Sequence, residues 1–317
     1  MQTYVISLET PTKLMDKLNS MHLNPILVEG VRGSTLTQTE INKNTTPLYS
    51  NFGPLSAIGC ALAHIKVWKL FLKSNNKYAL IFEDDCVFVD DFYNKLGIVM
   101  RHIPDDTDIL YLGCFGCTDI NFKLTYLNNI YKSKIVKINK YINKPAWALE
   151  MHSYIITKTG ANKLINNIDT KISNHVDVII NNLNINNKIN IYASNPLLAF
   201  QASNSINSNN ISNKHPKLIN NIIQNKYLAH NDIGELYYIF NVSLMRIGTI
   251  NINIFSVLFL FFGIICAIFN ISLLTITLVY FIISIYDIPD LSKYLFFHYF
   301  LFIFPCLINK LIRKIYF

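Results

Sequence analysis

The sequence contains little charge and no regular pattern of cysteines. Asp, Glu, Lys and Arg make up 15% of its 317 residues, while hydrophobic residues make up 51%. Disordered chains have the opposite balance, so this composition predicts one large or two ordinary folded domains. Small secreted scaffolds place their cysteines in loops, whereas here two lie in the apolar C-terminal part and two within apolar strand or helix patterns. We therefore expect no disulfide framework and a reducing compartment. The cysteines are Cys60, Cys86, Cys114, Cys117, Cys266 and Cys306.

Clustered basic residues are also missing. The formal net charge is +8, but the lysines are scattered among Asn and Ile rather than gathered in a stripe. Nucleic-acid-binding proteins gather their cations, so we expect no nucleic acid and favour a membrane surface or an anionic donor as the partner. Residues 1–8 lack the basic stretch of a signal peptide, and we expect none. The spacing of Cys114 and Cys117 fits a redox or zinc site only weakly, because no second such pair and no nearby pair of histidines accompanies it.

Hydrophobic periodicity predicts an α/β fold. A buried strand at 4–8, helical spacing of Leu14 and Leu18 within 11–21, and a strand at 26–29 form the order that is typical of a parallel sheet. We interpret the polar, turn-rich residues 35–53 as a loop. From Ser56 apolar residues recur every three or four positions, which predicts a helix that leads into a strand at 78–82. Further strands are expected at 108–112, 154–157, 189–193 and 197–200, a helix at 160–165, and a helix or strand at 175–180.

Three adjacent carboxylates, Glu83, Asp84 and Asp85, come directly after the predicted strand at 78–82. Such carboxylates repel one another unless a cation or strong donors neutralise them, and their oxygens suit Mg²⁺ or Mn²⁺. On a strand, Glu83 and Asp85 would project to the same side and approach one metal, while Asp84 would point toward a ribose or a backbone donor. The alternative is an acidic turn in which an Asp caps the next segment. His64 lies beside the apolar stripe of the preceding helix, where a hydrogen-bonded packing role is favoured over catalysis.

The C-terminal part is strongly apolar. Residues 254–286 contain no charged residue, and a straight helix of that length would measure about 50 Å against a hydrocarbon core of about 30 Å. The segment therefore either breaks near Asn270 or tilts, and a second apolar run lies at 294–308. Arg246 before the segment, and Lys310, Arg313 and Lys314 after it, predict a membrane hairpin with the N-terminal domain on the cytosolic side. The alternative is a hydrophobic helical subdomain packed on the soluble part.

Several separated motifs resemble glycosyltransferase family 25, which includes lipooligosaccharide and collagen galactosyltransferases. The resemblance covers about residues 3–204, and its most specific part is a helix motif together with the acidic strand end. The motifs are Tyr4-Val5-Ile6-Ser7-Leu8, Val31-Arg32-Gly33, Ile58-Gly59-Cys60-Ala61-Leu62-Ala63-His64 with Trp68, Leu80-Ile81-Phe82-Glu83-Asp84-Asp85, Tyr154-Ile155-Ile156-Thr157 with Gly160-Ala161 and Leu164, and Val176-Asp177.

The resemblance implies a fold of the GT-A type, in which a Rossmann-like α/β sheet binds a nucleotide sugar. It implies a UDP-sugar, expected to be UDP-galactose, as the donor, and Mn²⁺ or Mg²⁺ as the cation. Glu83 and Asp85 are then expected to hold the metal, and Ser7, Gly33 and Asp84 to border the nucleotide. Strand termination would explain Ser7 and Gly33 equally well.

The downstream motif of the family implies that Asp177 is the base of an inverting transfer, because a carboxylate must take the proton of the acceptor hydroxyl. Helix capping is the alternative role for Asp177, and Glu150, between Trp147 and His152, is the reserve candidate for the base.

We expect a glycosyltransferase domain at 1–204, a linker and amphipathic segment at 205–250, which includes much of the Asn- and Ser-rich stretch 202–216, and a membrane-associated hydrophobic tail at 251–317. The expected acceptor is a glycan, a lipid-linked molecule or a protein. The chain departs from the usual family pattern at Ser56, Ala57 and Ala63. These departures keep a second hypothesis open, in which the protein is a membrane-tethered, non-catalytic module that binds nucleotide sugars.

Overall fold

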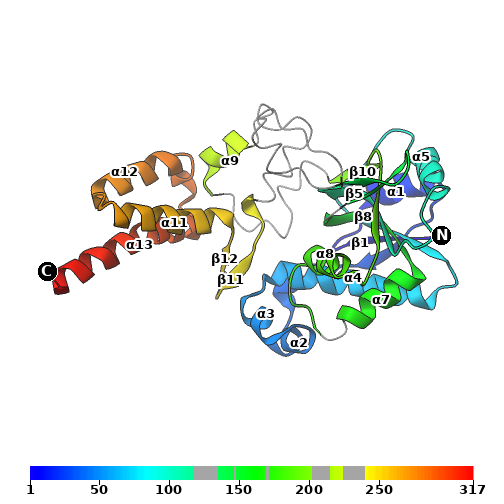
Figure 1. Ribbon diagram of the computed structural model, residues 1–317, viewed down its shortest axis with the longest axis horizontal. Helices are drawn as coiled ribbons and strands as arrows, with labels where there is room; N and C mark the ends of the chain where they lie inside the picture. Colours follow the sequence, from blue (N-terminus) through cyan, green and yellow to red (C-terminus); the bar gives the residue numbers. More distant parts are fainter. Residues whose placement is uncertain (118–134, 146–147, 169–170, 202–214, 224–239, 317) are drawn as a thin grey trace. The chain divides into compact units, whose positions relative to one another are not determined.

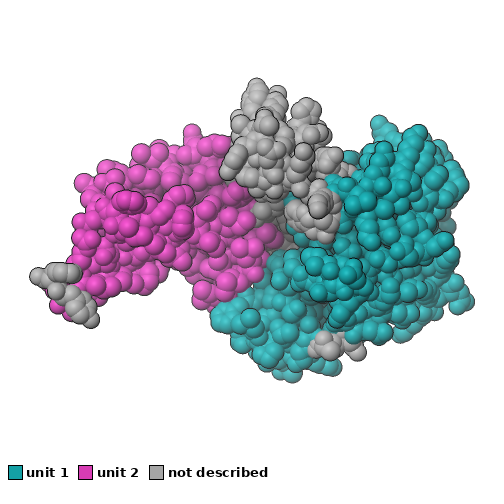
Figure 2. Space-filling view, in the orientation of Figure 1, with its two compact units in different colours: residues 1–205 teal, residues 206–317 magenta. Residues whose placement is uncertain are grey.

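The computed structural model describes residues 1–117, 135–145, 148–168, 171–201, 215–223 and 240–316. The chain divides into two compact units, Met1–Ser205 (unit 1) and Ile206–Phe317 (unit 2), which Figure 2 distinguishes by colour. Most of the stretch expected to act as a linker, at 202–214, lies outside the described residues.

Unit 1 is built on an eight-stranded sheet with the strand order β2-β1-β3-β8-β5-β9-β7-β6. The first three strands pair in parallel, as the strand–helix–strand opening predicts, and β5 and β9 are also parallel. β8, however, runs antiparallel between β3 and β5, so the sheet is mixed rather than parallel throughout. The strands are β1 Gln2–Ser7, β2 Ile26–Glu29, β3 Tyr78–Glu83, β5 Ile109–Phe115, β6 Val136–Lys137, β7 Ile142–Lys144, β8 Leu149–Thr157 and β9 Ile191–Ser194.

Helices cover both faces of this sheet (Figure 1). Side chains alternate along each strand, so Tyr4 packs in one core and its neighbour Val5 in the other. The first core includes Trp68 and Leu164 from helices on one face, and the second includes Leu18 from the other face. The predicted α/β architecture is therefore confirmed. The longer helices of unit 1 are α1 Thr12–Ser20, α4 Leu55–Lys73, α5 Phe92–Met100, α7 Lys158–Ile168 and α8 Val176–Ile185.

The prediction of a loop at 35–53 is wrong, because two short helices lie there, α2 Gln38–Asn44 and α3 Pro47–Phe52. Thr37 and Glu40 form a capping box at the start of α2, in which each side chain binds the other residue's backbone N–H. The Thr46 side chain caps α3, and proline occupies the first turn. Both helix starts lie in a polar stretch, so hydrophobic periodicity does not indicate the helices that follow them.

The structure also closes a disulfide between Cys114 and Cys117 at the end of β5. These two cysteines, whose redox-type spacing is only a weak signal in the sequence, are thus bonded to each other, and one such pair is not a disulfide framework. The other four, Cys60, Cys86, Cys266 and Cys306, are free thiols.

Unit 2 contains three apolar helices, α11 Ile254–Ile268, α12 Leu273–Ser284 and α13 Lys293–Tyr316. α11 and α12 are separated at Asn270, whose φ of 57° lies in the left-handed region that ends helices. The long apolar segment is thus broken where the sequence allowed a break. A short helix, α9 Lys217–Ile223, and a hairpin of β11 Met245–Ile247 and β12 Ile250–Ile252 complete the described part of this unit.

α11 and α13 run in the same direction. Near their starts, Ser256 Oγ lies 2.7 Å from His298 Nε2, and near their ends Asn309 donates a hydrogen bond to the Ala267 carbonyl. Arg246 therefore lies before the start of one helix, whereas the basic residues at 310–314 lie at the far end of the other. Three helical segments therefore separate the two basic flanks, rather than the two of a simple hairpin, and the membrane topology stays a prediction.

Large apolar side chains of unit 2 are exposed on all three helices. Side chains that are more than half exposed include Phe261, Ile268, Leu274, Phe281 and Phe296. Lys293–Ile315 is long and apolar enough to cross a membrane, while α11 and α12, at about 22 and 18 Å, are shorter than a hydrocarbon core of about 30 Å. Leu55–Lys73 passes the same test, but this helix lies in the core of unit 1.

The close approach of α4 to the loop after β2 requires Gly59. A Cβ at Gly59 would lie 2.2 Å from the Val31 carbonyl oxygen, whereas a Cβ at Gly97 in α5 would meet nothing closer than Arg101 Nη1 at 3.9 Å. We expect Gly59→Ala to lower the free energy of unfolding by about 1–3 kcal/mol through overpacking. The matched control Gly97→Ala should raise it by up to about 1 kcal/mol, because alanine favours the helix. Urea unfolding followed by the fluorescence of buried Trp68 measures both changes, and equal effects would contradict the packing role of Gly59.

Candidate active site

The acidic cluster lies where the sheet gives way to a turn. β3 ends at Glu83, Asp84 and Asp85 form a turn, and β4 Cys86–Phe88 then leaves the main sheet to pair with β10 Ala199–Gln201. The expectation that a strand continues through Asp85 is therefore wrong. The three carboxylates differ in orientation because the chain turns, and each has its own hydrogen-bond partner.

Glu83 is held by a line of three buried side chains. Trp68 Nε1 donates to the Tyr154 hydroxyl at 2.9 Å, that hydroxyl lies 2.9 Å from His64 Nδ1, and His64 Nε2 lies 2.9 Å from Glu83 Oε1. Trp68 and His64 lie on α4, Tyr154 on β8 and Glu83 at the end of β3. The line therefore connects one helix with two neighbouring strands.

The hydrogen-bonding groups of each side chain determine which atom donates and which accepts at each step of this line. The indole N–H of Trp68 can only donate, so the Tyr154 oxygen accepts and its own proton is left for His64 Nδ1. An unprotonated Nδ1 places the imidazole proton on Nε2, from which it is donated to the Glu83 carboxylate. Burial alone would raise the pKa of Glu83, but the hydrogen bond from His64 reverses this and holds the pKa below its usual value. His64 thus packs against its neighbours, as expected, and also fixes a charged Glu83.

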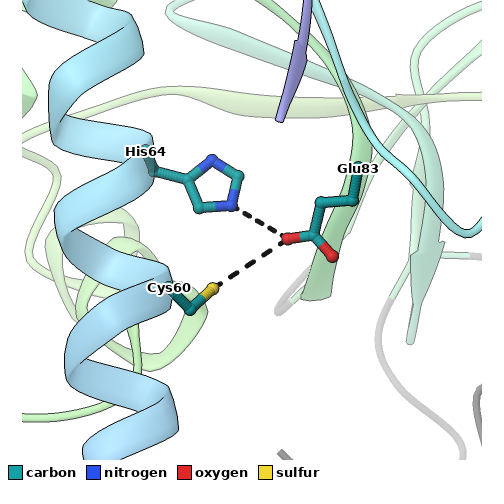
Figure 3. A group of neighbouring side chains, drawn as sticks. All are labelled: Cys60, His64 and Glu83. Atoms are coloured by element: carbon teal, nitrogen blue, oxygen red, sulfur yellow. Dashed lines mark hydrogen bonds and ion pairs between the residues drawn. The ribbon is translucent and has the colours of Figure 1, made fainter. Parts of the chain in front are cut away.

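Cys60 lies one helical turn before His64, with Sγ 4.0 Å from Glu83 Oε1 (Figure 3). The ligand atoms of Cys60, His64 and Glu83 lie within 4.8 Å of one another, as in a metal site. Burial, together with the charges of Glu83, Asp177 and Asp85, raises the pKa of Cys60 well above its usual value. In the structure, Cys60 and His64 both contact the same oxygen of Glu83, which joins the three side chains.

Asp84 turns toward β1. The Ser7 hydroxyl at the end of that strand donates to Asp84 Oδ2, and Ser7 Oγ also accepts from the Glu9 backbone N–H at 3.2 Å. Burial raises the pKa of Asp84, against the lowering effect of the hydrogen bond from Ser7. Two of the residues expected at the nucleotide are thus direct neighbours. Gly33 lies elsewhere, against the backbone of Leu55 at the start of α4, where a Cβ would be 1.7 Å from the carbonyl oxygen.

Asp85 is the least neutralised of the three. Its Oδ2 accepts a hydrogen bond from Gln201 Nε2 at 2.6 Å, while its buried Oδ1 has no hydrogen-bond partner among the described residues. Burial, and after it the charge of Glu83, raises the pKa of Asp85 to about 7. Sequence reasoning missed Gln201, because 116 positions separate it from Asp85 and only the β4–β10 pairing joins them.

Asp177 is connected to the cluster by a hydrogen bond with Glu150. Its Oδ2 accepts the Glu150 backbone N–H at 3.1 Å, and the φ of Glu150 is 71°, a strained value for a residue with a side chain. Glu150 Oε2 in turn lies 3.5 Å from Nδ1 of the buried His152. Asp177 lies in the first turn of α8, where its Oδ1 accepts the Val178 backbone N–H at 2.7 Å, although the N-cap residue itself is His175.

His152 is a buried imidazole beside these acids. Burial alone would lower the pKa of His152, but Glu150, together with Asp85 and Glu83, raises it above its usual value. Gly113 in β5 leaves space for this ring, since a Cβ there would lie 2.3 Å from His152 Nε2. Even a protonated His152 would offset only one of the negative charges that Glu83, Asp85, Glu150 and Asp177 can carry.

The donor set fits a hard divalent cation. The free oxygen of Asp85 is buried and unpartnered among the described residues, and the neighbouring Glu83 is held in its charged form. Carboxylate oxygens of this kind suit Mg²⁺ or Mn²⁺, and a cation would offset the excess negative charge. The residues present are therefore compatible with the metal that the sequence predicts.

Comparison with known proteins supports an enzymatic interpretation of this site. The model of the family described as "Glycosyltransferase family 25 (LPS biosynthesis protein)" matches residues 1–180. A "Procollagen galactosyltransferase 1-A" of Xenopus laevis is 28% identical over 107 residues, 30% of this chain and 18% of that protein. A "Putative glycosyltransferase" of Haemophilus influenzae is 32% identical over 119 residues, 36% of this chain and 42% of that protein.

A further relative carries a different description. A "Probable inactive glycosyltransferase 25 family member 3" of Rattus norvegicus is 25% identical over 127 residues, 35% of this chain and 22% of that protein. In each of these comparisons the matched part is less than half the length of the curated relative.

The line of donors predicts unequal effects for two buried tyrosines. Tyr154→Phe removes the hydroxyl that serves both Trp68 and His64, and we expect a loss of about 1–3 kcal/mol in the free energy of unfolding, because two buried groups lose their partner. The matched control Tyr111→Phe, on the neighbouring strand β5, removes only a bond to the Met151 sulfur and should cost less than about 1 kcal/mol. Urea denaturation measures both. A loss for Tyr154→Phe no larger than for Tyr111→Phe would contradict the line of donors.

Proposed function

Because the chain belongs to glycosyltransferase family 25, we propose that unit 1 transfers a hexose, with galactose as the expected sugar, from a UDP-sugar to an acceptor hydroxyl. The acceptor classes proposed are a glycan, a lipid-linked molecule or a protein. The observation that carries this proposal is the acidic cluster at the end of β3, in which Glu83 is bonded to His64 and Asp85 keeps a buried oxygen without a partner among the described residues. Ligands of open α/β sheets bind at such strand ends.

Glu83 and Asp85 are the proposed holders of Mn²⁺ or Mg²⁺. Asp85 offers a buried oxygen without a protein partner in the described part of the chain, and His64 keeps Glu83 charged and oriented. When bound, such a cation would supply positive charge next to the diphosphate that leaves with UDP.

The donor nucleotide is proposed to lie beside β1. Ser7 and Asp84 are joined there by a hydrogen bond, which leaves the second oxygen of Asp84 for a ribose hydroxyl. Gly33 is the weakest of the three proposed nucleotide contacts, because its lack of a side chain is already explained by the close packing against Leu55. The GT-A arrangement of the donor is part of the same proposal.

Asp177 is the proposed base. The acceptor oxygen forms a bond to the anomeric carbon while the bond from that carbon to the diphosphate oxygen breaks, and the hydroxyl proton passes to the Asp177 carboxylate. UDP departs with the electron pair, and because the acceptor oxygen attacks from the opposite face, the configuration at the anomeric carbon inverts. The hydrogen bond from the Glu150 N–H to Oδ2 would hold the carboxylate in place for this step.

A second candidate function is a non-catalytic module that binds nucleotide sugars. It is favoured by the departures at Ser56, Ala57 and Ala63 on α4, and by the description of one relative as inactive. Ala57 and Ala63 are buried, so both positions contribute to packing rather than offering a reactive group. Turnover separates the two functions, while binding of UDP is common to both.

Unit 2 is proposed to hold the enzyme at a membrane. Its exposed apolar side chains would otherwise face water, and α13 is long enough to cross a bilayer. Placement of unit 1 on the cytosolic side stays a prediction, and glycosylation-site mapping of the full chain tests it.

Two substitutions should separate binding from turnover. Asp85→Asn removes a proposed metal ligand and should abolish the Mn²⁺-dependent binding of UDP, measured by calorimetry. Asp177→Asn should keep UDP affinity but lower the rate of transfer or hydrolysis of a UDP-hexose by about 10²–10⁴-fold, the usual contribution of a general base.

The matched control is Asp16→Asn on the exposed face of α1, which should leave both quantities unchanged. Folded wild-type protein that turns over no UDP-hexose but binds UDP with Mn²⁺ would favour the non-catalytic module. Failure to bind UDP at all would contradict both functions.

A further inference from the structure

A groove lined by lysines lies on unit 1, between α4, α7 and the end of α2. Its volume is about 390 Å³, and all the residues that line it belong to unit 1. We name it the lysine groove after its five cations. These are Lys43, Lys66, Lys69, Lys73 and Lys171.

The lysine groove is separate from the candidate active site. Lys66, Lys69 and Lys73 succeed one another at intervals of three and four residues, so they share one face of α4. His64 and Trp68 lie on the buried face of the same helix, which faces the sheet. A ligand in the groove would therefore occupy the outer surface of unit 1 and leave the carboxylate cluster free.

Within the part of the chain that the structure describes, no carboxylate lines the groove or pairs with its lysines. None of its lining residues is Asp or Glu, and none of its five lysines forms an ion pair within the described residues. The Nζ atoms of Lys66 and Lys171 instead donate to the backbone carbonyls of Glu29 and Asn42. Five like charges around one cavity repel one another, and an anion in the groove would relieve that repulsion.

Aliphatic side chains lie between the cations. Leu62, Ile65 and Ile165 are partly buried in the lining, and Leu70 is 40% exposed. A free phosphate needs no apolar contact, and single-stranded nucleic acids are held by aromatic and arginine side chains, of which the lining has none. Lysines interleaved with aliphatic groups suit a phosphate that carries a hydrocarbon chain, as in a phospholipid.

We propose that the lysine groove binds the headgroups of anionic phospholipids. The proposal rests on the membrane attachment proposed for unit 2, whose exposed apolar helices supply an independent reason to expect a bilayer near this chain. Unit 2 would then provide apolar anchoring and the groove would provide preference for negative charge. Two signals of this kind make membrane attachment stable.

Flotation of the full chain with vesicles tests the proposal. Vesicles of neutral phosphatidylcholine are compared with vesicles that also contain phosphatidylglycerol. We expect wild-type protein to bind the anionic vesicles more tightly. The variant Lys66→Gln/Lys69→Gln/Lys73→Gln should lose about a hundredfold of its affinity for them, since each surface lysine contributes about fivefold. Its affinity for neutral vesicles should not change.

The matched control removes the same charge elsewhere on unit 1, at three exposed lysines, in the variant Lys13→Gln/Lys137→Gln/Lys188→Gln. Equal losses for the two triple variants, or equal binding of wild-type protein to both kinds of vesicle, would overturn the proposal. A second pair, Leu70→Glu in the groove and Leu48→Glu outside it, places one negative charge on an exposed leucine. Only Leu70→Glu should reduce the preference for anionic vesicles.

Two further outcomes keep the proposals distinguishable. If inorganic phosphate abolishes the preference while chloride at equal ionic strength does not, the groove is a site for soluble phosphate and the lipid proposal fails. If wild-type protein binds no vesicles at all, the membrane attachment of unit 2 fails as well. UDP-hexose turnover in solution tests the catalytic proposal separately from either result.

Discussion

The hydrogen bond between His64 and Glu83 joins helix α4 to the end of strand β3, and the candidate site depends on it. A carboxylate in a buried position is costly unless it is paired, and here the pairing partner is itself fixed by Tyr154 and Trp68. The interior of unit 1 therefore determines both the charge of Glu83 and its direction. The helix motif that contains His64 and the strand motif that ends at Glu83 are neighbours in the sequence, and this hydrogen bond makes them parts of one site.

Neighbouring carboxylates acquire different properties because their surroundings differ. Glu83 receives a proton donor from the helix, and Asp84 receives one from Ser7 on β1. Asp85 keeps one buried oxygen without a partner in the described part of the chain, and its pKa is raised to about 7 by burial and by Glu83. When protein groups cannot neutralise all of several neighbouring carboxylates, a bound cation can do so. The site thus has one carboxylate bonded to the helix, one bonded to β1, and one with an oxygen that has no partner among the described residues.

Local signals in the sequence predicted six of the eight sheet strands, the long helix and the acidic strand end, because periodicity and charge are visible in neighbouring residues, whereas the short strands β6 and β7 lie in a region without such a pattern. The capping box of Thr37 and Glu40 was equally local and was overlooked within a polar stretch. Other features could not be predicted. The contact of Gln201 with Asp85 spans 116 positions, and the position of Asp177 depends on the left-handed backbone of Glu150, which tertiary structure imposes.

The open oxygen of Asp85, beside a charged Glu83, is where we expect the cation to bind. Anomalous diffraction from crystals of the full chain grown with Mn²⁺ and UDP tests this expectation directly. We predict a manganese peak in contact with an Asp85 oxygen and the diphosphate, with His64 still bonded to Glu83. A peak between Cys60 and His64, or bound UDP with no manganese at Asp85, would contradict it.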